Sequence, residues 1–399
     1  MKILIAENGQ HVVRACRHMA KNGHYIIFAS PMAHSRVNRI FFSKSYSEVV
    51  KIDNADNDTE RIKQIKRVYN EKNCDVFYPF GFELVTDYIN VSNNHKELKM
   101  NTPYGKYKNY WNLSDKHSLY RLLKDTDVLL PKLFGHVKFG KWTKLKEKDF
   151  PVIVKKTKGV GIKKNVILAW NNKDVNSFIS NFSKNEKEEC EFILQQYISG
   201  DIFDVGGFGI EGEIYCAIPQ RRTVTLPLRG GVAAVNDIYD DQELIEIAST
   251  IINKAKWTGP FQAEFRHDPK SNKYYLLEIN AKMWGSTPLS LKSNSNLLEI
   301  ALNTAVGHKV EKNLNYKNEL RYRWICSQEL RAISMGSIMD LKDFFSRFCK
   351  KSYYDIDLND PLPDLLRLLK TLFVIFFLRS NLPKPLVNQK THERLNEIS

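Results

Sequence analysis

The first part of the chain alternates short apolar runs with a stretch whose apolar residues recur at helical spacing. KILIA near the N-terminus and YIIFAS after it resemble strands, and HVVRACRHMAKNG between them has the pattern of an amphipathic helix. Gly23 stands where a glycine commonly ends a helix, just before the second run. Because such alternation is typical of βαβ units in a parallel sheet, we predict an α/β domain over residues 1–110.

Residues 111–310 have a different pattern, in which strands and turns dominate. A predicted helix with Ser114 or Asp115 as its N-cap precedes two β-rich segments that flank the loop KKTKGVGIKK, residues 155–164. The strand EFILQQYISG follows this loop. We therefore predict a second domain that mixes strands and helices in an α+β arrangement.

Two β-hairpins are predicted in the second half of this domain. The first consists of two β-rich runs around Glu211, Gly212 and Glu213, and the second turns between Asp268 and Asn272. The stretch between the hairpins, ELIEIASTIINKAK, has the apolar spacing of a helix.

Residues 311–399 are mainly helical in pattern. Their longest apolar run, LFVIFFL, is far below the roughly 20 residues that a membrane-spanning helix needs. Basic residues stand in and around this run, and two interpretations stay open: a helix that lies in a membrane interface, or a helix packed on the rest of the protein. These basic residues are Arg367, Lys370, Arg379 and Lys384.

Composition narrows the class of protein. The chain has 43% hydrophobic and 26% charged residues, which is ordinary for a globular protein, and its 399 residues suffice for two or three domains. Its six cysteines show no CxxC pair or zinc-finger spacing, which favours free thiols in a reducing compartment. The first apolar run is too short for a signal peptide. We therefore expect a cytoplasmic protein, with peripheral contact at the inner face of the membrane as the alternative.

The net charge of +15 would suit a nucleic acid, an anionic membrane surface or a phosphorylated substrate. The lysines, however, are spread along the whole chain, which equally fits a solvated surface. Because the sequence has no interleaved aromatic and basic patch and no reader motif, we do not expect nucleic acid to be the partner.

The second hairpin places acidic side chains close together. Glu278 and Asn280 are two residues apart on one strand, so they project from the same face, and Glu264 falls almost opposite Glu278 on the partner strand. Two facing carboxylates repel unless a cation lies between them. Together with the carboxamide oxygen they form an oxygen set that suits Mg²⁺. The alternative is that these groups face solvent on the outer side of a half-buried sheet.

Three cationic residues of this part of the chain are candidates for an anion-binding site, with a surface arginine pair as the alternative for two of them. Lys155 closes the apolar run PVIV, where a buried ammonium would be costly without an anionic partner. Arg221 and Arg222 end the first hairpin and point to opposite faces of their strand, so we expect only one of them to reach a site.

The order of these parts resembles the ATP-grasp superfamily, which includes biotin carboxylase, carbamoyl phosphate synthetase and D-alanyl-D-alanine ligase. SDK, PVIVKK with its glycine loop, ILQQYISG, the arginine hairpin and LLEINAKMWGS appear in that family's order over roughly residues 1–310. The resemblance implies three parts: a Rossmann-like pre-ATP-grasp domain at 1–110, an ATP-grasp domain of two subdomains at 111–310, and a mainly helical C-terminal region at 311–399.

The resemblance also implies a role for each residue that matches a family motif. Residues that would bind ATP are Lys116, Lys155, Lys158, Gly159, Gly161, Gln196, Tyr197, Ile198 and Asp201. Residues that would hold Mg²⁺ or Mn²⁺ are Glu264, Glu278 and Asn280, and those that would steady the acyl phosphate are Arg222, or Arg221, and Lys282.

The implied activity is that of an ADP-forming carboxylate-amine ligase, which activates a carboxylate as an acyl phosphate and joins it to an amine. Small molecules or cell-envelope precursors would supply the two substrates. Two departures from the family pattern, Ala281-Lys282 for Pro-Arg and Gln196 for Glu, motivate an alternative: a protein that binds nucleotide without ligase turnover.

Overall fold

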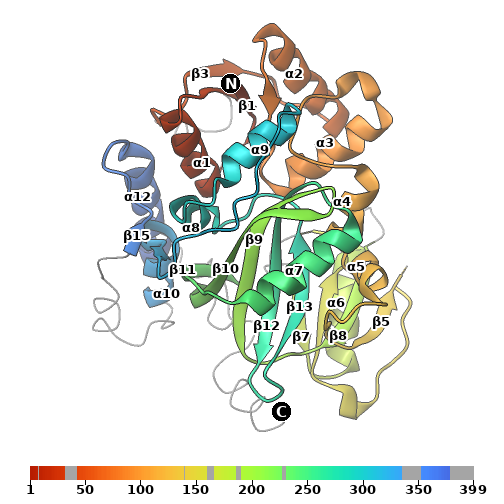
Figure 1. Cartoon of the computed structure of the whole chain (residues 1–399). Coiled ribbons are helices and arrows are strands. Elements are labelled where there is room, and N and C mark those ends of the chain that lie inside the picture. Colours follow the sequence, from red (N-terminus) through yellow and green to blue (C-terminus); the bar gives the residue numbers. More distant parts are fainter. Residues whose placement is uncertain are drawn as a thin grey trace.

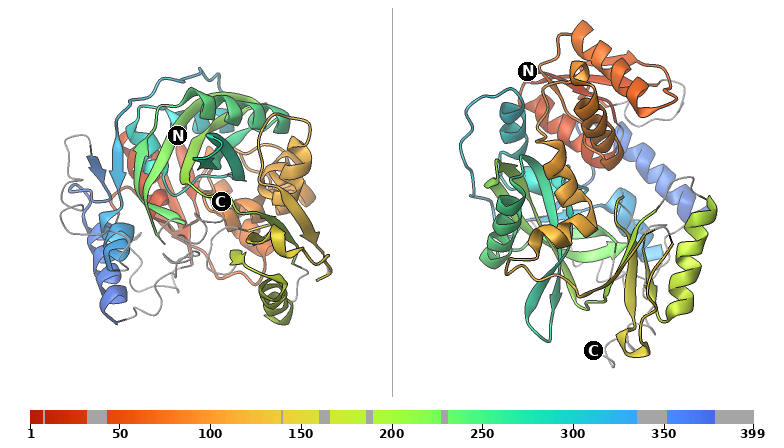
Figure 2. Two further views of the ribbon diagram at one scale, coloured as in Figure 1. Left: turned by 90° about the horizontal axis from the view of Figure 1, so that it is seen from below. Right: turned by 90° about the vertical axis from the view of Figure 1, so that its right-hand side faces the viewer.

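The computed structural model describes residues 1–7, 9–31, 43–138, 140–159, 166–185, 190–226, 231–334 and 352–377. Within these residues the strands form two four-stranded sheets and one seven-stranded sheet. The N-terminal sheet and its helices occupy one end of the molecule, and the other two sheets lie side by side at the opposite end (Figures 1 and 2). No helix in the described ranges is long and apolar enough to cross a membrane.

The N-terminal part is the predicted parallel α/β unit. Its strand order is β3-β2-β1-β4, and every neighbouring pair is parallel. Gly23 follows the first helix at a φ of +81°, which confirms its predicted position at the helix end. The elements are β1 (Lys2–Ile5), α1 (Gln10–Lys21), β2 (Tyr25–Ser30), β3 (Glu48–Lys51), α2 (Asp58–Glu71), β4 (Val76–Phe77), α3 (Phe82–Asn94) and a 3₁₀ turn, η3 (Lys96–Leu98).

The smaller antiparallel sheet has the order β5-β8-β6-β7. The predicted helix N-cap is Asp115, whose side chain accepts a hydrogen bond from the backbone N–H of Ser118. Of the loop between the two β-rich segments, residues 160–165 lie outside the described ranges. The elements here are α4 (Tyr107–Ser114), α5 (Lys116–Leu123), β5 (Leu133–Val137), η4 (Glu147–Asp149), β6 (Val152–Lys156), β7 (Val166–Ala169), α6 (Asn172–Asn185) and β8 (Phe192–Gln196).

The seven-stranded sheet contains both predicted hairpins. Glu211 and Gly212 have φ of +50° and +90°, so both central residues of the first turn adopt the left-handed conformations that a two-residue hairpin favours. One buried apolar cluster runs from β1 through α7 to β12, so this sheet and the N-terminal part share a core. The elements are β9 (Asp201–Ile210), β10 (Glu213–Leu226), β11 (Val232–Ile238), α7 (Gln242–Ala255), β12 (Gly259–Asp268), β13 (Lys273–Asn280), α8 (Thr287–Lys292) and α9 (Leu297–Ala305).

The C-terminal region has the expected helices but also extends the large sheet. Strand β14 (Arg321–Arg323) pairs with β11, and β15 (Ser352–Tyr354) pairs with β14. Each has only three residues, which is too short for a period-two pattern to be read from sequence. The helical segments are a π-helical turn (Ile325–Glu329), α10 (Leu330–Ser334) and α12 (Leu362–Phe377).

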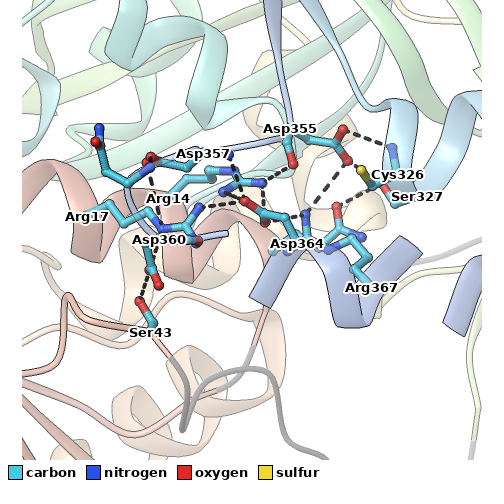
Figure 3. Close-up of polar contacts among 12 residues, drawn as sticks. Arg14, Arg17, Ser43, Cys326, Ser327, Asp355, Asp357, Asp360, Asp364 and Arg367 are labelled. Atoms are coloured by element: carbon cyan, nitrogen blue, oxygen red, sulfur yellow. Dashed lines mark hydrogen bonds and ion pairs between the residues drawn. The ribbon is translucent and has the colours of Figure 1, made fainter. Parts of the chain in front are cut away.

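A buried ionic cluster joins α12 to α1 of the N-terminal part (Figure 3). Arg14 Nη2 lies 2.7 Å from Asp364 Oδ1, and Arg17 Nη1 lies 3.0 Å from Asp364 Oδ2. Arg17 Nε also donates to Asp360 Oδ2 at 2.8 Å. Arg367 lies within the same cluster, 3.7 Å from Asp364. The contacts of Arg14 and Arg17 join residues more than 340 positions apart in sequence.

We predict that Asp364→Ala lowers the free energy of unfolding by about 3 kcal/mol or more, because it leaves two buried arginines without their shared carboxylate. Asp357→Ala is the matched control, since that side chain is 36% exposed at the rim of the cluster, and it should cost about 1 kcal/mol or less. Chemical denaturation measures both variants. Equal small losses would contradict the prediction.

Candidate functional site

The structure brings the predicted acidic residues of the second hairpin together. Glu264 and Glu278 are direct cross-strand partners on β12 and β13. The carboxamide nitrogen of Asn280 donates to Glu264 Oε1 at 2.9 Å and to Gln262 Oε1 at 3.2 Å. The predicted register and shared face are therefore present, and they follow from the turn position and the two-residue period of a strand.

A third carboxylate, which sequence reasoning missed, lies beside these two. Asp204 on β9 is the cross-strand partner of Glu264 on its other side, and it is fully buried. Three carboxylates thus form a row across β9, β12 and β13. A single aspartate inside the apolar, glycine-rich run FDVGGFG was the signal that could have indicated it.

Side-chain cations lie between these carboxylates. Arg222 makes a two-bond contact with Asp204, at 2.8 and 2.6 Å, and its Nη2 lies 3.0 Å from Glu264 Oε2. Arg221 points away and pairs with Asp201 at 2.6 Å. Only one of the two arginines therefore enters the cluster, as their adjacent positions on a strand predict.

Two lysines from the smaller sheet and its preceding helix reach Glu278. Lys116, at the start of α5, places its Nζ 3.2 Å from Glu278 Oε2 and 3.2 Å from the carbonyl oxygen of Gly159. Lys155 near the end of β6 is buried and donates to the carbonyl oxygen of Leu277 at 2.8 Å. Burial lowers the pKa of Lys155 to about 8, although nearby Glu278 partly offsets this.

The two facing glutamates have opposite pKa shifts. Burial raises the pKa of Glu264 to about 7, against the opposing effect of Arg222. Burial would raise the pKa of Glu278 as well, but Lys116 and Lys155 outweigh it and hold that pKa at about 2. The charged cluster therefore holds one firmly ionised glutamate and one that binds a proton near neutral pH.

Lys282 lies where the hairpin approaches the N-terminal part. Its Nζ donates to the carbonyl oxygen of Met283 at 3.3 Å, and burial lowers its pKa while Glu264, Glu278 and Glu7 oppose this. Glu7, which follows β1, accepts hydrogen bonds from the backbone N–H groups of Phe80 and Gly81. Sequence reasoning also missed Glu7, because nothing local indicates that the end of β1 lies near this hairpin.

A pocket lies among these groups. It is bounded by the N-terminal part, α4, the glycine loop and the end of β13. The lining residues are Phe82, Tyr110, Ser114, Lys116, Gly159, Glu278, Ile279, Asn280, Ala281 and Lys282.

The remaining predicted residues lie around the smaller sheet. Gln196 ends β8, where its backbone N–H donates to Lys132 O at 2.8 Å, and Tyr197 and Ile198 follow it. Lys158 lies over the Trp111 ring, 4.8 Å from its centroid. Gly161, which was predicted to contact ATP, lies outside the described residues.

The oxygen set of the hairpin fits Mg²⁺ in its chemistry, because two carboxylates and the carboxamide oxygen of Asn280 are hard ligands on one face. Among the residues that the structure describes, no group of three or more His, Cys, Asp and Glu side chains is placed to hold a metal ion. A metal here would therefore depend on the asparagine and on further oxygens, such as those of phosphates.

Comparison with known proteins identifies the fold. A family model described as "ATP-grasp in the biosynthetic pathway with Ter operon" matches residues 188–328. A search of curated protein sequences finds no match.

Several solved structures share the arrangement. The biotin carboxylase of Campylobacter jejuni matches with a TM-score of 0.64 at 16% identity, over 80% of this chain and 74% of its own. The biotin carboxylase domain of the Hydrogenobacter thermophilus 2-oxoglutarate carboxylase, in complex with MgADP, matches with a TM-score of 0.62 at 16% identity. The match covers 80% of this chain and 73% of that domain's chain. The L-amino acid ligase of Bacillus licheniformis matches with a TM-score of 0.57 at 14% identity, over 76% of this chain and 74% of its own. At these identities the likeness establishes the fold.

The raised pKa of Glu264 predicts a pH dependence of stability. Between about pH 4.5 and 7 the folded protein holds a proton that the unfolded chain has released, so this residue makes the free energy of unfolding fall as pH rises. We expect Glu264→Gln to reduce the fall by about 1 to 3 kcal/mol in denaturant titrations at the two ends of this window. Glu243→Gln on the exposed face of α7 should leave the fall unchanged. If the free energy of unfolding of Glu264→Gln fell with pH as steeply as that of the wild type, the raised pKa of Glu264 would be refuted.

Proposed function

This chain has the ATP-grasp fold, and from that premise we propose that it is an ATP- and Mg²⁺-dependent ligase. It would activate a carboxylate as an acyl phosphate, with release of ADP, and join it to an amine. The observation that carries the proposal is the convergence of Lys116 on α5, Lys155 on β6 and the Glu264–Glu278 pair of the β12–β13 hairpin. Of these residues, Lys116 and Glu278 line the pocket. Such a set combines cations for phosphates with oxygens for a divalent metal.

Nucleotide binding would exchange partners within the charged cluster. Lys116 now pairs with Glu278, and Lys155, which is also buried, is close enough to lower the pKa of that carboxylate. Phosphate oxygens would take over both lysines, which frees Glu278 to hold Mg²⁺ together with Glu264 and Asn280. Bound Mg²⁺ would offset the charge on the transferred phosphoryl group. The exchange keeps each buried charge paired, which is a condition for burying it.

The glycine loop and the segment after β8 would bind the rest of the nucleotide. Gly159 already accepts a hydrogen bond from Lys116, so the loop and the phosphate-binding lysine are coupled. We propose that Lys158, Gly159 and Gly161 cover the phosphates. Residues 196–198 would contact the adenine, and Asp201 would lie near the ribose once it is released from Arg221.

For the acyl phosphate, the contacts favour Lys282 over Arg222 as the group that meets the substrate. Arg222 is already bonded to Asp204, Glu264 and the carbonyl oxygen of Gly231, so its guanidinium orients Glu264. Lys282 lines the pocket, and its hydrogen bond to Met283 O is long at 3.3 Å. A lysine here supplies a point charge in place of the bidentate fork of an arginine.

The substrates would be a small-molecule or cell-envelope-precursor carboxylate and an amine. Release of ADP over a panel of carboxylates and amines, with mass spectrometry of the products, tests this. Nucleotide binding without ADP release on any pair would instead favour a nucleotide-binding protein that does not ligate.

We predict that Glu278→Ala abolishes ATP turnover, with a loss of at least about 100-fold, because it removes a metal ligand and the partner of Lys116. Glu246→Ala on the exposed face of α7 is the matched control and should keep full turnover. Circular dichroism checks that both variants are folded. Turnover retained in folded Glu278→Ala would refute the metal assignment.

A second prediction concerns Lys282. Lys282→Met should lower kcat by about 100-fold or more while leaving the KM for ATP nearly unchanged, because the charge acts on the acyl phosphate and its tetrahedral successor. Lys282→Arg should keep most of the activity, since it retains the charge. A parallel rise of KM for ATP in Lys282→Met would place this lysine on the nucleotide instead.

A further inference from the structure

Helix α12 exposes apolar side chains along one whole face. These residues recur at spacings of three and four, so they form a continuous stripe on the helix. The stripe stands on an element at the margin of the molecule (Figure 1). Its members are Leu362, Leu365, Leu369, Phe373, Phe376 and Phe377, with exposed fractions of 39, 51, 54, 53, 73 and 73%.

The opposite face of the same helix is ionic and buried. Asp364, Arg367 and Thr371 stand at i, i+3 and i+7, and each is exposed by 2% or less. This reverses the usual arrangement, in which the apolar face of a helix turns inward. The outward-facing side of α12 is therefore apolar and suited to contact with an apolar environment outside the protein.

The ionic cluster fixes this orientation. Asp364 is bonded to both Arg14 and Arg17 of α1, with N···O distances of 2.7 to 3.1 Å (Figure 3). A rotation of α12 that buried the apolar stripe would separate these charges, and breaking one buried pair alone costs about 3 to 5 kcal/mol. The helix consequently holds its stripe outward whether or not anything covers it.

We propose that α12 is a membrane-docking helix that lies in the interface of a bilayer of anionic phospholipids, with its apolar stripe among the acyl chains. Two observations favour lipid as the occupant. The stripe lies on a single helix at the margin of the molecule, and such a helix can insert into a fluid interface without a matching groove (Figure 1). Residues Leu358 and Ile356, just before the helix, are also exposed, by 85% and 45%, and enlarge the apolar surface.

The charges around the stripe are complementary to anionic headgroups. Three of the four acidic residues of this region, Asp355, Asp360 and Asp364, are buried in the ionic cluster, and the fourth, Asp357, is 36% exposed at its rim. Lys370 by contrast is exposed on the helix. The sequence after the helix adds basic residues, and the chain as a whole carries a net charge of +15. Arg367, which sequence alone grouped with these basic residues, is instead buried among the aspartates.

Vesicle flotation of the full chain tests the proposal. The protein should float with vesicles of phosphatidylcholine and phosphatidylglycerol, and its binding should fall with added salt and on pure phosphatidylcholine. Phe373→Glu should weaken binding to the mixed vesicles by about tenfold or more, because it removes a large apolar side chain from the interface. Leu314→Glu, at an equally exposed leucine (50%) outside α12, is the matched control and should bind as the wild type does.

Two further variants complete the test. One separates the electrostatic contribution of Lys370 from the apolar contribution of the stripe, and the other covers the case in which Phe373→Glu misfolds. Lys370→Gln should bind mixed vesicles about fivefold more weakly and pure phosphatidylcholine unchanged. Phe373→Gln, a milder change at the same exposed position, serves if Phe373→Glu does not fold.

The outcomes are decisive and independent of ligase activity. Wild-type flotation by folded Phe373 variants would overturn the proposal, as would equal binding to neutral and anionic vesicles. A lipid-free dimer in analytical ultracentrifugation that Phe373→Glu dissociates would overturn it in favour of a second copy of the chain.

Discussion

The row of carboxylates across β9, β12 and β13 is the constraint on which the rest of the site depends. Asp204, Glu264 and Glu278 are neighbours in register, and like charges placed directly opposite destabilise a sheet. The sheet can hold them only because cations lie among them. Each of those cations comes from another element, so the charges are paired only when these elements are packed together.

The cations come from the parts that an ATP-grasp fold brings together. Arg222 belongs to the same sheet, whereas Lys116 and Lys155 come from the helix and strand beside the glycine loop. The smaller sheet is thereby tied to the large one through its charged groups. In the function we propose, phosphates would compete with Glu278 for these lysines, so nucleotide binding would act on these ties directly. A ligand that changes the partners of such pairs can also change how the two sheets sit against each other.

The C-terminal region is likewise held in place by a buried cluster of opposite charges. Its aspartates meet Arg14 and Arg17 of α1, and this cluster fixes α12 on the N-terminal part. The ions take the inner face of the helix, so the apolar residues remain outside. In both places a buried set of charges fixes the orientation of the element that carries it.

Local pattern in the sequence was enough for the parallel N-terminal unit, for both hairpins and for the register of Glu264 with Glu278. Each of these depends on a period of two or 3.6 residues, or on a turn within one hairpin, so the spacing of residues along the chain specifies it. The same is true of a helix N-cap at Ser114 or Asp115, of which the structure selects Asp115, and of the opposite directions of Arg221 and Arg222.

Tertiary structure alone decided that Asp204 joins the acidic row, that Lys116 meets Glu278, and that Arg367 turns inward. Their partners lie on other strands and helices, and the spacing along one segment carries no information about them. Tertiary structure also determined the short strands β14 and β15, which form because the edge of the large sheet offers them a pairing partner. The sequence determined which side chains share a face, and the packing of distant segments determined what each face meets, because burial and charge pairing are properties of the whole fold.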